Sequence, residues 1–382
     1  MIVSKKVKLH PTKTQNQKMI QSAGTSRWAY NWTIAKQQEN YSLGNKFIQD
    51  GEIRKELTQL KKTEELNWLN DYSNNITKKA IKDACDAYKK FFKKLSMIPK
   101  FKSRKKSRPS FYQDTEKIKF KDGKVRLEKI GWVNLAEKDR IPEDSKYCNP
   151  RITNDGLDWY VSVGIEVEKP ILDNVVTEPI GIDLGIKDLA VVSNGQTFKN
   201  INKQKKIKKL KKRLKRQQKK ASKLYEKIKK KENVTKSYNL MKQELQIKKT
   251  YKTMTDVRTN HIHQMTSKLV RNNPEYITIE TLNISNMMKN KHISRAIQEQ
   301  KLFEVIRQLR YKCDWYGIEL REVDKWFPSS KTCSDCGFVH TNLQLKDRIF
   351  KCPSCGFEIN RDYNASINLR ECNKYKIYKA TH

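Results

Sequence analysis

The chain has 382 residues, and its 81 lysines and arginines outnumber its 42 aspartates and glutamates, which gives a formal net charge of +39. No fold requires such an excess, and it costs self-repulsion, so a polyanion is the expected partner. No run of eighteen apolar residues is present, which excludes a membrane-spanning helix and favours nucleic acid over a bilayer as that polyanion. The lysine-rich composition without a signal peptide indicates a cytoplasmic protein.

The first hundred residues predict one strand followed by helices. Residues 1–9 alternate between apolar and polar side chains, as a short strand does. Thr12 and Gln15 then form a capping box, which opens a helix. Three or four amphipathic helices are expected between residues 13 and 95. Three aromatic residues at helical spacing favour a place in the core over stacking on bases: Trp28, Tyr30 and Trp32.

A basic segment, residues 99–108 (PKFKSRKKSR), carries six cationic side chains and no acid, which indicates a linker or a loop that contacts phosphates. Its candidate nucleic-acid-binding residues are Lys102, Arg104, Lys105 and Lys106. From 110 to 168 the pattern changes to short alternating strands, with a turn at Asp122–Gly123. Together with the first strand, these predict a small β-barrel that the helical segment interrupts.

Residues 179–198 predict a strand, a tight turn, a second strand and a hairpin at Asn194–Gly195 that leads to a third strand. Asp183 lies inside the first of these strands between apolar neighbours. A carboxylate is costly there unless a metal ion uses it.

Residues 203–220 contain twelve lysines and arginines and no acid, with a thin apolar stripe at helical spacing. We expect a helix that continues to about residue 249 and lies against a phosphate backbone. A coiled coil is disfavoured because the apolar seam does not persist over several heptads. The candidate nucleic-acid-binding residues here are Lys208, Lys209, Lys212, Arg213 and Arg216.

Two further carboxylates sit beside apolar elements later in the chain. Glu280 ends the strand predicted at 276–282, and Asp362 lies in the first turn of the helix predicted at 361–369. Between them the sequence predicts a helix at 294–316 and a strand at 318–323.

Two C-x-x-C pairs, Cys333/Cys336 and Cys352/Cys355, are separated by fifteen residues. This spacing lets two tight turns aim four thiolates at one point, and a glycine follows each pair where a positive φ is needed. Two disulfides or four free thiols are the alternatives, but structural disulfides are rare in the cytosol. The spacing therefore predicts a four-cysteine zinc site. Four protein ligands leave no open position, so this zinc is expected to be structural, and His340 is not needed as a ligand.

The three carboxylates follow a recognisable order: Asp183 on the first strand of a meander, Glu280 at the end of a later strand, and Asp362 on a final helix. This is the order of a ribonuclease H-like fold, in which the three side chains meet at one sheet edge. They would repel one another unless cations bind them. Two Mg²⁺ ions about 4 Å apart would neutralise them and support an in-line phosphodiester displacement.

At this point the sequence resembles the TnpB family, the insertion-sequence-encoded relatives of type V CRISPR effector nucleases. The matching segments span almost the whole chain: LHPT with TSRWAYNW, SFYQ, KIGWV, GIDLGIKDLAVVSNG, IETLN, FPSSKTCSDCG and CGFEINRDYNASINL.

The resemblance implies a multidomain α+β architecture. Its expected parts are a split wedge β-barrel (1–10 and 105–172), a helical recognition lobe with the basic linker (11–104), a RuvC-like nuclease domain (178–330 and 357–382) with a basic helical insert at about 203–270, and a zinc ribbon (331–356).

The resemblance also implies RNA-guided cleavage of double-stranded DNA beside a short transposon-adjacent motif. The implied partners are a guide RNA from the transposon end and the target DNA, bound by a monomer in the bacterial cytoplasm at the nucleoid. The implied catalytic residues are Asp183, Glu280 and Asp362. Asn360 stands where the family usually has Asp, a position that is not a metal ligand, and we expect it to cap the helix.

Two alternatives remain open. A nuclease-inactive relative would use RNA guidance only to occupy DNA, but it is expected to lack at least one of the three carboxylates. A DNA transposase also uses an acidic triad, and the His261-Ile262-His263 sequence has the local look of a single-strand transposase motif. It lacks supporting context, because it falls in a basic helical segment.

Overall fold

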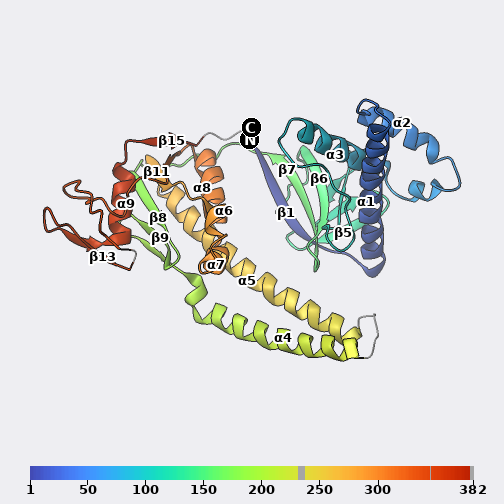
Figure 1. The fold of residues 1–382 in the computed structure, drawn as a ribbon. Coiled ribbons are helices and arrows are strands. Elements are labelled where there is room, and N and C mark those ends of the chain that lie inside the picture. Colours follow the sequence, from blue (N-terminus) through green and yellow to red (C-terminus); the bar gives the residue numbers. More distant parts are fainter. Residues whose placement is uncertain (231–236, 345, 379–382) are drawn as a thin grey trace. The chain divides into compact units, whose positions relative to one another are not determined.

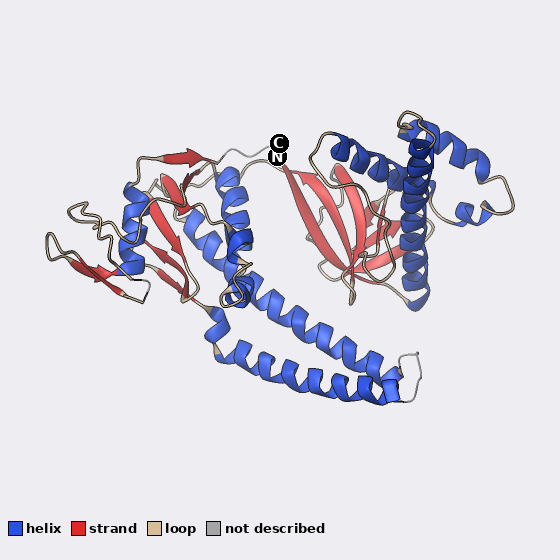
Figure 2. Cartoon of the chain, viewed as in Figure 1, coloured by secondary structure: helices blue, strands red, loops and turns tan. Residues whose placement is uncertain are grey.

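A computed structural model describes residues 1–230, 237–344 and 346–378 (Figure 1). The chain divides into two compact units, residues 1–168 and 169–382. Both units mix helices and strands (Figure 2). In the described part of the chain, none of the helices has the length and apolar character needed to cross a bilayer.

The unit of residues 1–168 contains seven strands and a helical insertion. Its elements are β1 (Ile2–His10), α1 (Lys13–Ser42), α2 (Asp50–Leu60), a 3₁₀ helix (Asn67–Asp71), α3 (Asn74–Phe92), β2 (Ser110–Tyr112), β3 (Lys119–Lys121), β4 (Lys124–Leu127), β5 (Gly131–Leu135), β6 (Tyr147–Asn154) and β7 (Trp159–Glu166). Strand β1 pairs antiparallel with both β5 and β7, so the first strand joins the strands that follow residue 110.

The sheet of this unit has the order β2-β6-β7-β1-β5-β4-β3. Val7 and Leu9 of β1 alternate into its core, as the sequence pattern predicts. The helices enter between β1 and β2, and Met19 of α1 and Ile76 of α3 complete the same core. Closure of this sheet into a wedge barrel stays a prediction.

The helical insertion follows its local signals. The side chains of Thr12 and Gln15 form the predicted capping box at the start of α1. Trp28 and Trp32 stack with their ring centroids 5.9 Å apart, and both pack against buried clusters between the helices. Tyr30 is buried in a neighbouring cluster. The aromatic residues therefore belong to the core, as predicted.

The unit of residues 169–382 is built on a six-stranded sheet. Its elements are β8 (Ile180–Leu184), β9 (Asp188–Val192), β10 (Thr197–Lys199), a 3₁₀ helix (Ile201–Lys203), α4 (Lys205–Lys230), α5 (Tyr238–Arg271), β11 (Tyr276–Glu280), α6 (Ile284–Met287), α7 (Ser294–Gln300), α8 (Leu302–Tyr316), β12 (Glu319–Val323), β13 (Ile349–Lys351), β14 (Glu358–Asn360), α9 (Arg361–Glu371) and β15 (Tyr375–Ile377).

The strand order of this sheet is β10-β9-β8-β11-β12-β15. Strands β8, β9 and β10 form an antiparallel meander, and β11 and β12 then add parallel to β8. Helices α5 and α8 bury apolar side chains against one face, among them Leu269 and Leu309. Helix α9 contacts β8, β9 and β11.

Two helical predictions were wrong. The basic helix does not continue straight to residue 249, because α4 ends at Lys230 and α5 packs back along it, with Gln218 donating to the hydroxyl of Tyr251 at 3.0 Å. Residues 231–236, which the predicted continuation crossed, lie outside the described residues. The hairpin that α4 and α5 form buries only a few apolar residues, such as Leu214 and Met254. It therefore needs no heptad seam in the sequence.

The helix predicted at 294–316 is divided. Lys301 adopts a left-handed conformation, with φ 57° and ψ 43°, and separates α7 from α8. Neither glycine nor proline marks this break in the sequence, so pattern alone could not reveal it.

Candidate functional site

Two of the predicted carboxylates lie side by side on adjacent strands. Ile182 of β8 pairs with Ile279 of β11 in parallel register, so Asp183 and Glu280 are the next residues along the two strands. The two isoleucines are buried in the core beneath α5 and α8. Because successive side chains of a strand alternate between faces, both carboxylates point to the opposite face of the sheet.

Helix α9 covers that opposite face because Gly181 lets it approach. A Cβ at Gly181 would lie 2.0 Å from the carbonyl oxygen of Ser366 and 2.5 Å from the amide nitrogen of Arg370. Only a residue without a side chain fits beneath the helix. The Tyr363 hydroxyl also donates to the carbonyl oxygen of Ser193 at 3.2 Å, which fixes the start of α9 against the sheet.

Asp362 lies in the first turn of α9, as predicted. Asn360 caps this turn, since its Oδ1 accepts hydrogen bonds from the amides of Asp362 at 3.0 Å and Tyr363 at 3.2 Å. The capping prediction for Asn360 is confirmed. Asparagine is among the best capping residues, so the start of this helix is well formed.

The electrostatics of the site show that two of the carboxylates, Asp362 and Glu280, act on the third, Asp183. The pKa of Asp183 is raised to about 7, first by burial, then by the negative charges of Asp362 and Glu280, while Arg361 opposes the shift. Burial also raises the pKa of Glu280. A site with this excess of negative charge and oxygen ligands fits hard divalent cations such as Mg²⁺.

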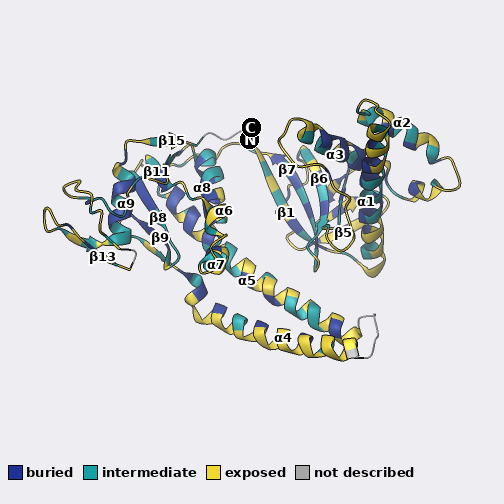
Figure 3. Ribbon diagram, viewed as in Figure 1, coloured by how far each residue is buried: buried dark blue, intermediate teal, exposed yellow. Residues whose placement is uncertain are grey.

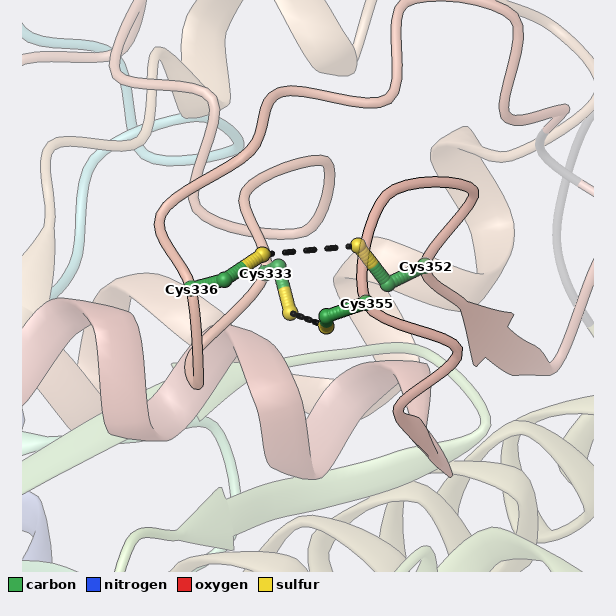
Figure 4. A group of neighbouring side chains, drawn as sticks. All are labelled: Cys333, Cys336, Cys352 and Cys355. Atoms are coloured by element: carbon green, nitrogen blue, oxygen red, sulfur yellow. Dashed lines mark hydrogen bonds between the residues drawn. The ribbon is translucent and has the colours of Figure 1, made fainter.

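The four predicted cysteines gather at one point (Figure 4). The Sγ atoms of Cys333 and Cys355 are 3.7 Å apart, and those of Cys336 and Cys352 are 3.6 Å apart. Four thiolates at a Zn–S distance of about 2.3 Å around a tetrahedral ion would be about 3.8 Å apart. The arrangement therefore fits zinc. Among the described residues, the four cysteines are the group whose ligand atoms all lie within 4.8 Å of one another. The oxygens of Asp183, Glu280 and Asp362 do not form such a group, so these carboxylates are spaced more widely.

The two halves of the cluster have the same local structure. In the first knuckle, residues 333–338, the amide of Cys333 donates to the carbonyl of Phe338 and that of Gly337 to Cys333. The second knuckle, residues 352–357, repeats both bonds. The two glycines have φ values of 76° and 77°, as predicted. His340 lies outside the thiol group, with its ring edge-on to Phe350.

Two asparagines of α9 bind the first knuckle and the segment that leads into it, and sequence reasoning missed them. Asn364 donates to the carbonyl of Thr332 at 2.6 Å and accepts from the amide of Ser334 at 3.0 Å. Asn368 donates to the carbonyls of Ser329 and Thr332, both at 2.7 Å. Both asparagines are buried. Two amides four residues apart in an otherwise apolar helix face were the available signal.

The predicted nucleic-acid-binding residues differ in their surroundings. The ammonium of Lys102 lies 3.5 Å from the ring centroid of Tyr30, and the side chain of Asn31 bonds its backbone amide and carbonyl. The three other candidates of this segment, Arg104, Lys105 and Lys106, are exposed, as is Lys102. On α4, all five candidates are exposed along a helix that faces solvent over much of its length (Figure 3).

The His261-Ile262-His263 sequence lies on α5. Ile262 is buried in the core, and the Nε2 atom of His261 lies 3.1 Å from the carbonyl oxygen of Lys199.

Comparisons with known proteins identify the family. A protein of Streptomyces pristinaespiralis named "Putative RNA-guided DNA endonuclease" is 30% identical over 372 residues, which cover 95% of this chain and 87% of that protein. The chain belongs to the TnpB family. A second relative, "Putative RNA-guided DNA endonuclease InsQ" of Escherichia coli (strain K12), is 28% identical and covers 95% of this chain and 90% of its own.

Three family models match parts of this TnpB chain: "Cas12f1-like, TNB domain" at residues 303–369, "Probable transposase" at 162–291 and "Helix-turn-helix domain" at 1–46. The last name does not describe the structure, because residues 1–46 hold one strand and the single long helix α1. The match to the TNB domain contains the four cysteines and the two asparagines of α9, Asn364 and Asn368, which we call the asparagine clamp.

The TnpB chain also shares its fold with a solved structure. The protein in "Cryo-EM structure of the Cas12f1-sgRNA-target DNA complex" aligns with a TM-score of 0.61 at 16% identity, over 95% of this chain and 83% of that one. The chain is therefore a mixed α+β protein with the fold seen in Cas12f1. The curated Cas12f1 of Sulfoacidibacillus thermotolerans is 34% identical over 84 residues, 22% of this chain and 20% of its own.

Proposed function

We propose that this protein is an RNA-guided endonuclease of a transposable element that cuts double-stranded DNA beside a short transposon-adjacent motif. The convergence of Asp183, Glu280 and Asp362 on one face of the sheet carries the proposal, since three carboxylates in a chain of charge +39 suit phosphodiester cleavage. Relatives over most of the chain bear the name RNA-guided DNA endonuclease, and the aligned Cas12f1 complex contains guide RNA and target DNA.

The strand order supports a nuclease domain of the RuvC type. The first carboxylate lies on the first strand of the meander, the second on the adjacent parallel strand, and the third on the helix that crosses them. When bound, two Mg²⁺ ions would supply Lewis-acid activation of water and stabilise the leaving oxygen. The three side chains would hold both ions on this face of the sheet, where the scissile phosphate would be presented.

The zinc ribbon has a structural role in this proposal. Four thiolates would complete the coordination of the ion. The hydrogen bonds of Asn364 and Asn368 to the ribbon would then hold α9 in place. We assign the unit of residues 1–168 to the wedge barrel and its helical recognition lobe, which bind the guide RNA and the duplex motif. The protein would act as a monomer in this complex.

The test is cleavage of a plasmid that carries a target matching the copurified RNA. Asp183→Ala should bind guide and target but not cut, because the triad serves the reaction and not affinity. Asp188→Asn, on the next strand, is the matched control and should cut normally. Full cutting by Asp183→Ala, or specific cutting by RNA-free protein, would overturn the proposal.

The same assay separates the alternatives. Target binding by the wild type without any Mg²⁺-dependent cutting would indicate a nuclease-inactive binder. Covalent protein–DNA adducts would indicate a transposase.

A further inference from the structure

Helices α4, α5 and α7 enclose a basic cavity of about 810 Å³ on the side of the unit that bears the helical hairpin. One acidic side chain, Glu299, lines it. Six cationic side chains line it as well: Lys211, Lys212, Lys215, Arg258, Arg295 and Lys301. Glu299 is already engaged by Lys211 at 2.5 Å and Arg295 at 3.3 Å. The cavity therefore keeps a large excess of positive charge.

Arg258 lies deep in this cavity with an unused donor. Its side chain is 13% exposed, and its Nε donates to Oδ1 of Asn202 at 2.7 Å. Its Nη2 is buried and has no hydrogen-bond partner, since the nearest Glu299 oxygen is 3.9 Å away. A buried charged donor that makes no hydrogen bond is costly, and its only ionic contact among the described residues is with a glutamate that Lys211 and Arg295 already hold, so Nη2 points to a ligand that accepts from it.

The cavity wall is held rigidly. Lys301 keeps its left-handed backbone conformation, unfavourable for a residue with a side chain, and its Nζ donates to the hydroxyl of Thr259 at 2.6 Å. Asn202, which orients Arg258, also donates to the carbonyl of Glu299 at 3.0 Å. Gln300 donates to the carbonyl of Gly185 at 3.3 Å, in the turn that follows β8. A network of hydrogen bonds thus runs from the cavity wall to the strand of Asp183.

We propose that this cavity binds a backbone phosphate of a nucleic-acid strand, with Arg258 as the inner donor and the lysines of α4 around the rim. A phosphodiester oxygen accepts from a guanidinium and carries the charge that the cavity lacks. The choice of nucleic acid over a free phosphate rests on the proposed function. The test measures binding without Mg²⁺, so a failure of cleavage does not affect it.

The experiment compares two charge-preserving variants of the RNA-free full chain, Arg258→Lys and Arg271→Lys. The probe is a fluorescein-labelled RNA–DNA hybrid of about 20 base pairs, followed by anisotropy in EDTA-free, magnesium-free buffer. Arg258→Lys should bind about ten-fold more weakly, because a lysine cannot reproduce the forked donor geometry. Arg271→Lys, exposed at the end of the same helix and outside the cavity lining, should stay within about two-fold of the wild type.

If Arg258→Lys melts at a lower temperature than the wild type, its weaker binding could reflect lost stability. A second pair of variants then tests the cavity without changing Arg258. Lys212→Ala/Lys215→Ala removes two rim charges, and Lys219→Ala/Lys220→Ala removes two from the same helix outside the cavity. The rim pair should lose more affinity than its control. Equal losses would overturn the proposal.

Inorganic pyrophosphate serves as the second probe. One outcome would contradict the assignment to a nucleic-acid strand. Pyrophosphate would raise the melting temperature of the wild type but not of the rim variant, and all variants would bind the hybrid with the same affinity. The cavity would then bind a free anion.

Discussion

The side-chain amide of Asn364 donates a hydrogen bond to the carbonyl oxygen of Thr332 over 2.6 Å, so α9 is tied to the residue that precedes the first zinc knuckle. Asn368, one turn later, bonds the same carbonyl at 2.7 Å. Asp362 precedes Asn364 by two residues on the same helix. The position of this carboxylate therefore depends on a ribbon that contributes no ligand to the carboxylate site.

Asn364→Ala should slow DNA cleavage by about 10- to 100-fold, the range seen when groups that orient metal ligands are removed. The Mg²⁺ concentration for half-maximal cleavage should rise, because Asp362 loses its support, while zinc content and target binding stay at wild-type levels. Glu371→Ala, exposed near the end of the same helix, is the control. A wild-type Mg²⁺ dependence in Asn364→Ala would show that the clamp does not position the site.

Asp183→Asn should stabilise the protein while abolishing cleavage. The pKa of Asp183 is raised from its ordinary 3.8 to about 7, so the carboxyl leaves stability unchanged below pH about 4 and lowers it progressively as the pH rises toward 7. In magnesium-free buffer the variant should melt roughly 3–8 °C above the wild type at pH 8 and little above it at pH 4.5. Differential scanning calorimetry measures both values. A pH-independent difference would contradict the assigned cause.

Cys352→Ser should release zinc and unfold the ribbon, because a structural zinc contributes folding free energy directly. Cleavage should fall in parallel as α9 loses the knuckle that it binds. Cys148→Ser, in strand β6 and outside the thiol group, should keep both zinc and activity. Atomic emission on the purified proteins gives the metal content, and an absence of zinc from the wild type would refute the site.

Gly181→Ala should displace α9, since the new Cβ would lie 2.0 Å from the carbonyl oxygen of Ser366. The clashing groups are all backbone, so only a shift of the helix or of the strand can relieve the overlap. We therefore expect a loss of several kcal/mol, about what severe overpacking causes, and no cleavage. Gly24→Ala, in α1 with open space around it, is the matched control and should be neutral or stabilising. Proteolysis of α9 in the Gly181 variant checks the displacement.

Local chemistry allowed the most secure predictions. The spacing of Cys333, Cys336, Cys352 and Cys355 defines a tetrahedral cluster whatever surrounds it, and the Asn360 cap depends on the next three residues alone. The strand and helix that carry Asp183 and Asp362 followed from apolar periodicity. Their catalytic roles stay predictions.

The missed features depend on distant partners. Gly181 matters only because α9, far later in the chain, packs on it, and Asn364 resembles a surface residue until the ribbon covers it. The break at Lys301 carries no glycine or proline, and the side chain of Lys301 donates to Thr259 of α5. Only a few buried residues are needed where α4 and α5 pack together, so the apolar stripe of α4 is thin. The sequence pattern therefore did not reveal this packing.

The place of the ribbon between β12 and α9 sets an order of assembly. The strands that bear Asp183 and Glu280 leave the ribosome before the cysteines, and the helix that bears Asp362 leaves after them. Because the first knuckle bonds this helix, we expect the helix to dock fully only after the knuckle has closed around its metal. If the proposed function holds, a newly made chain without zinc would position two of the three carboxylates and would not cut DNA. The supply of one structural ion would then control when the proposed nuclease becomes active.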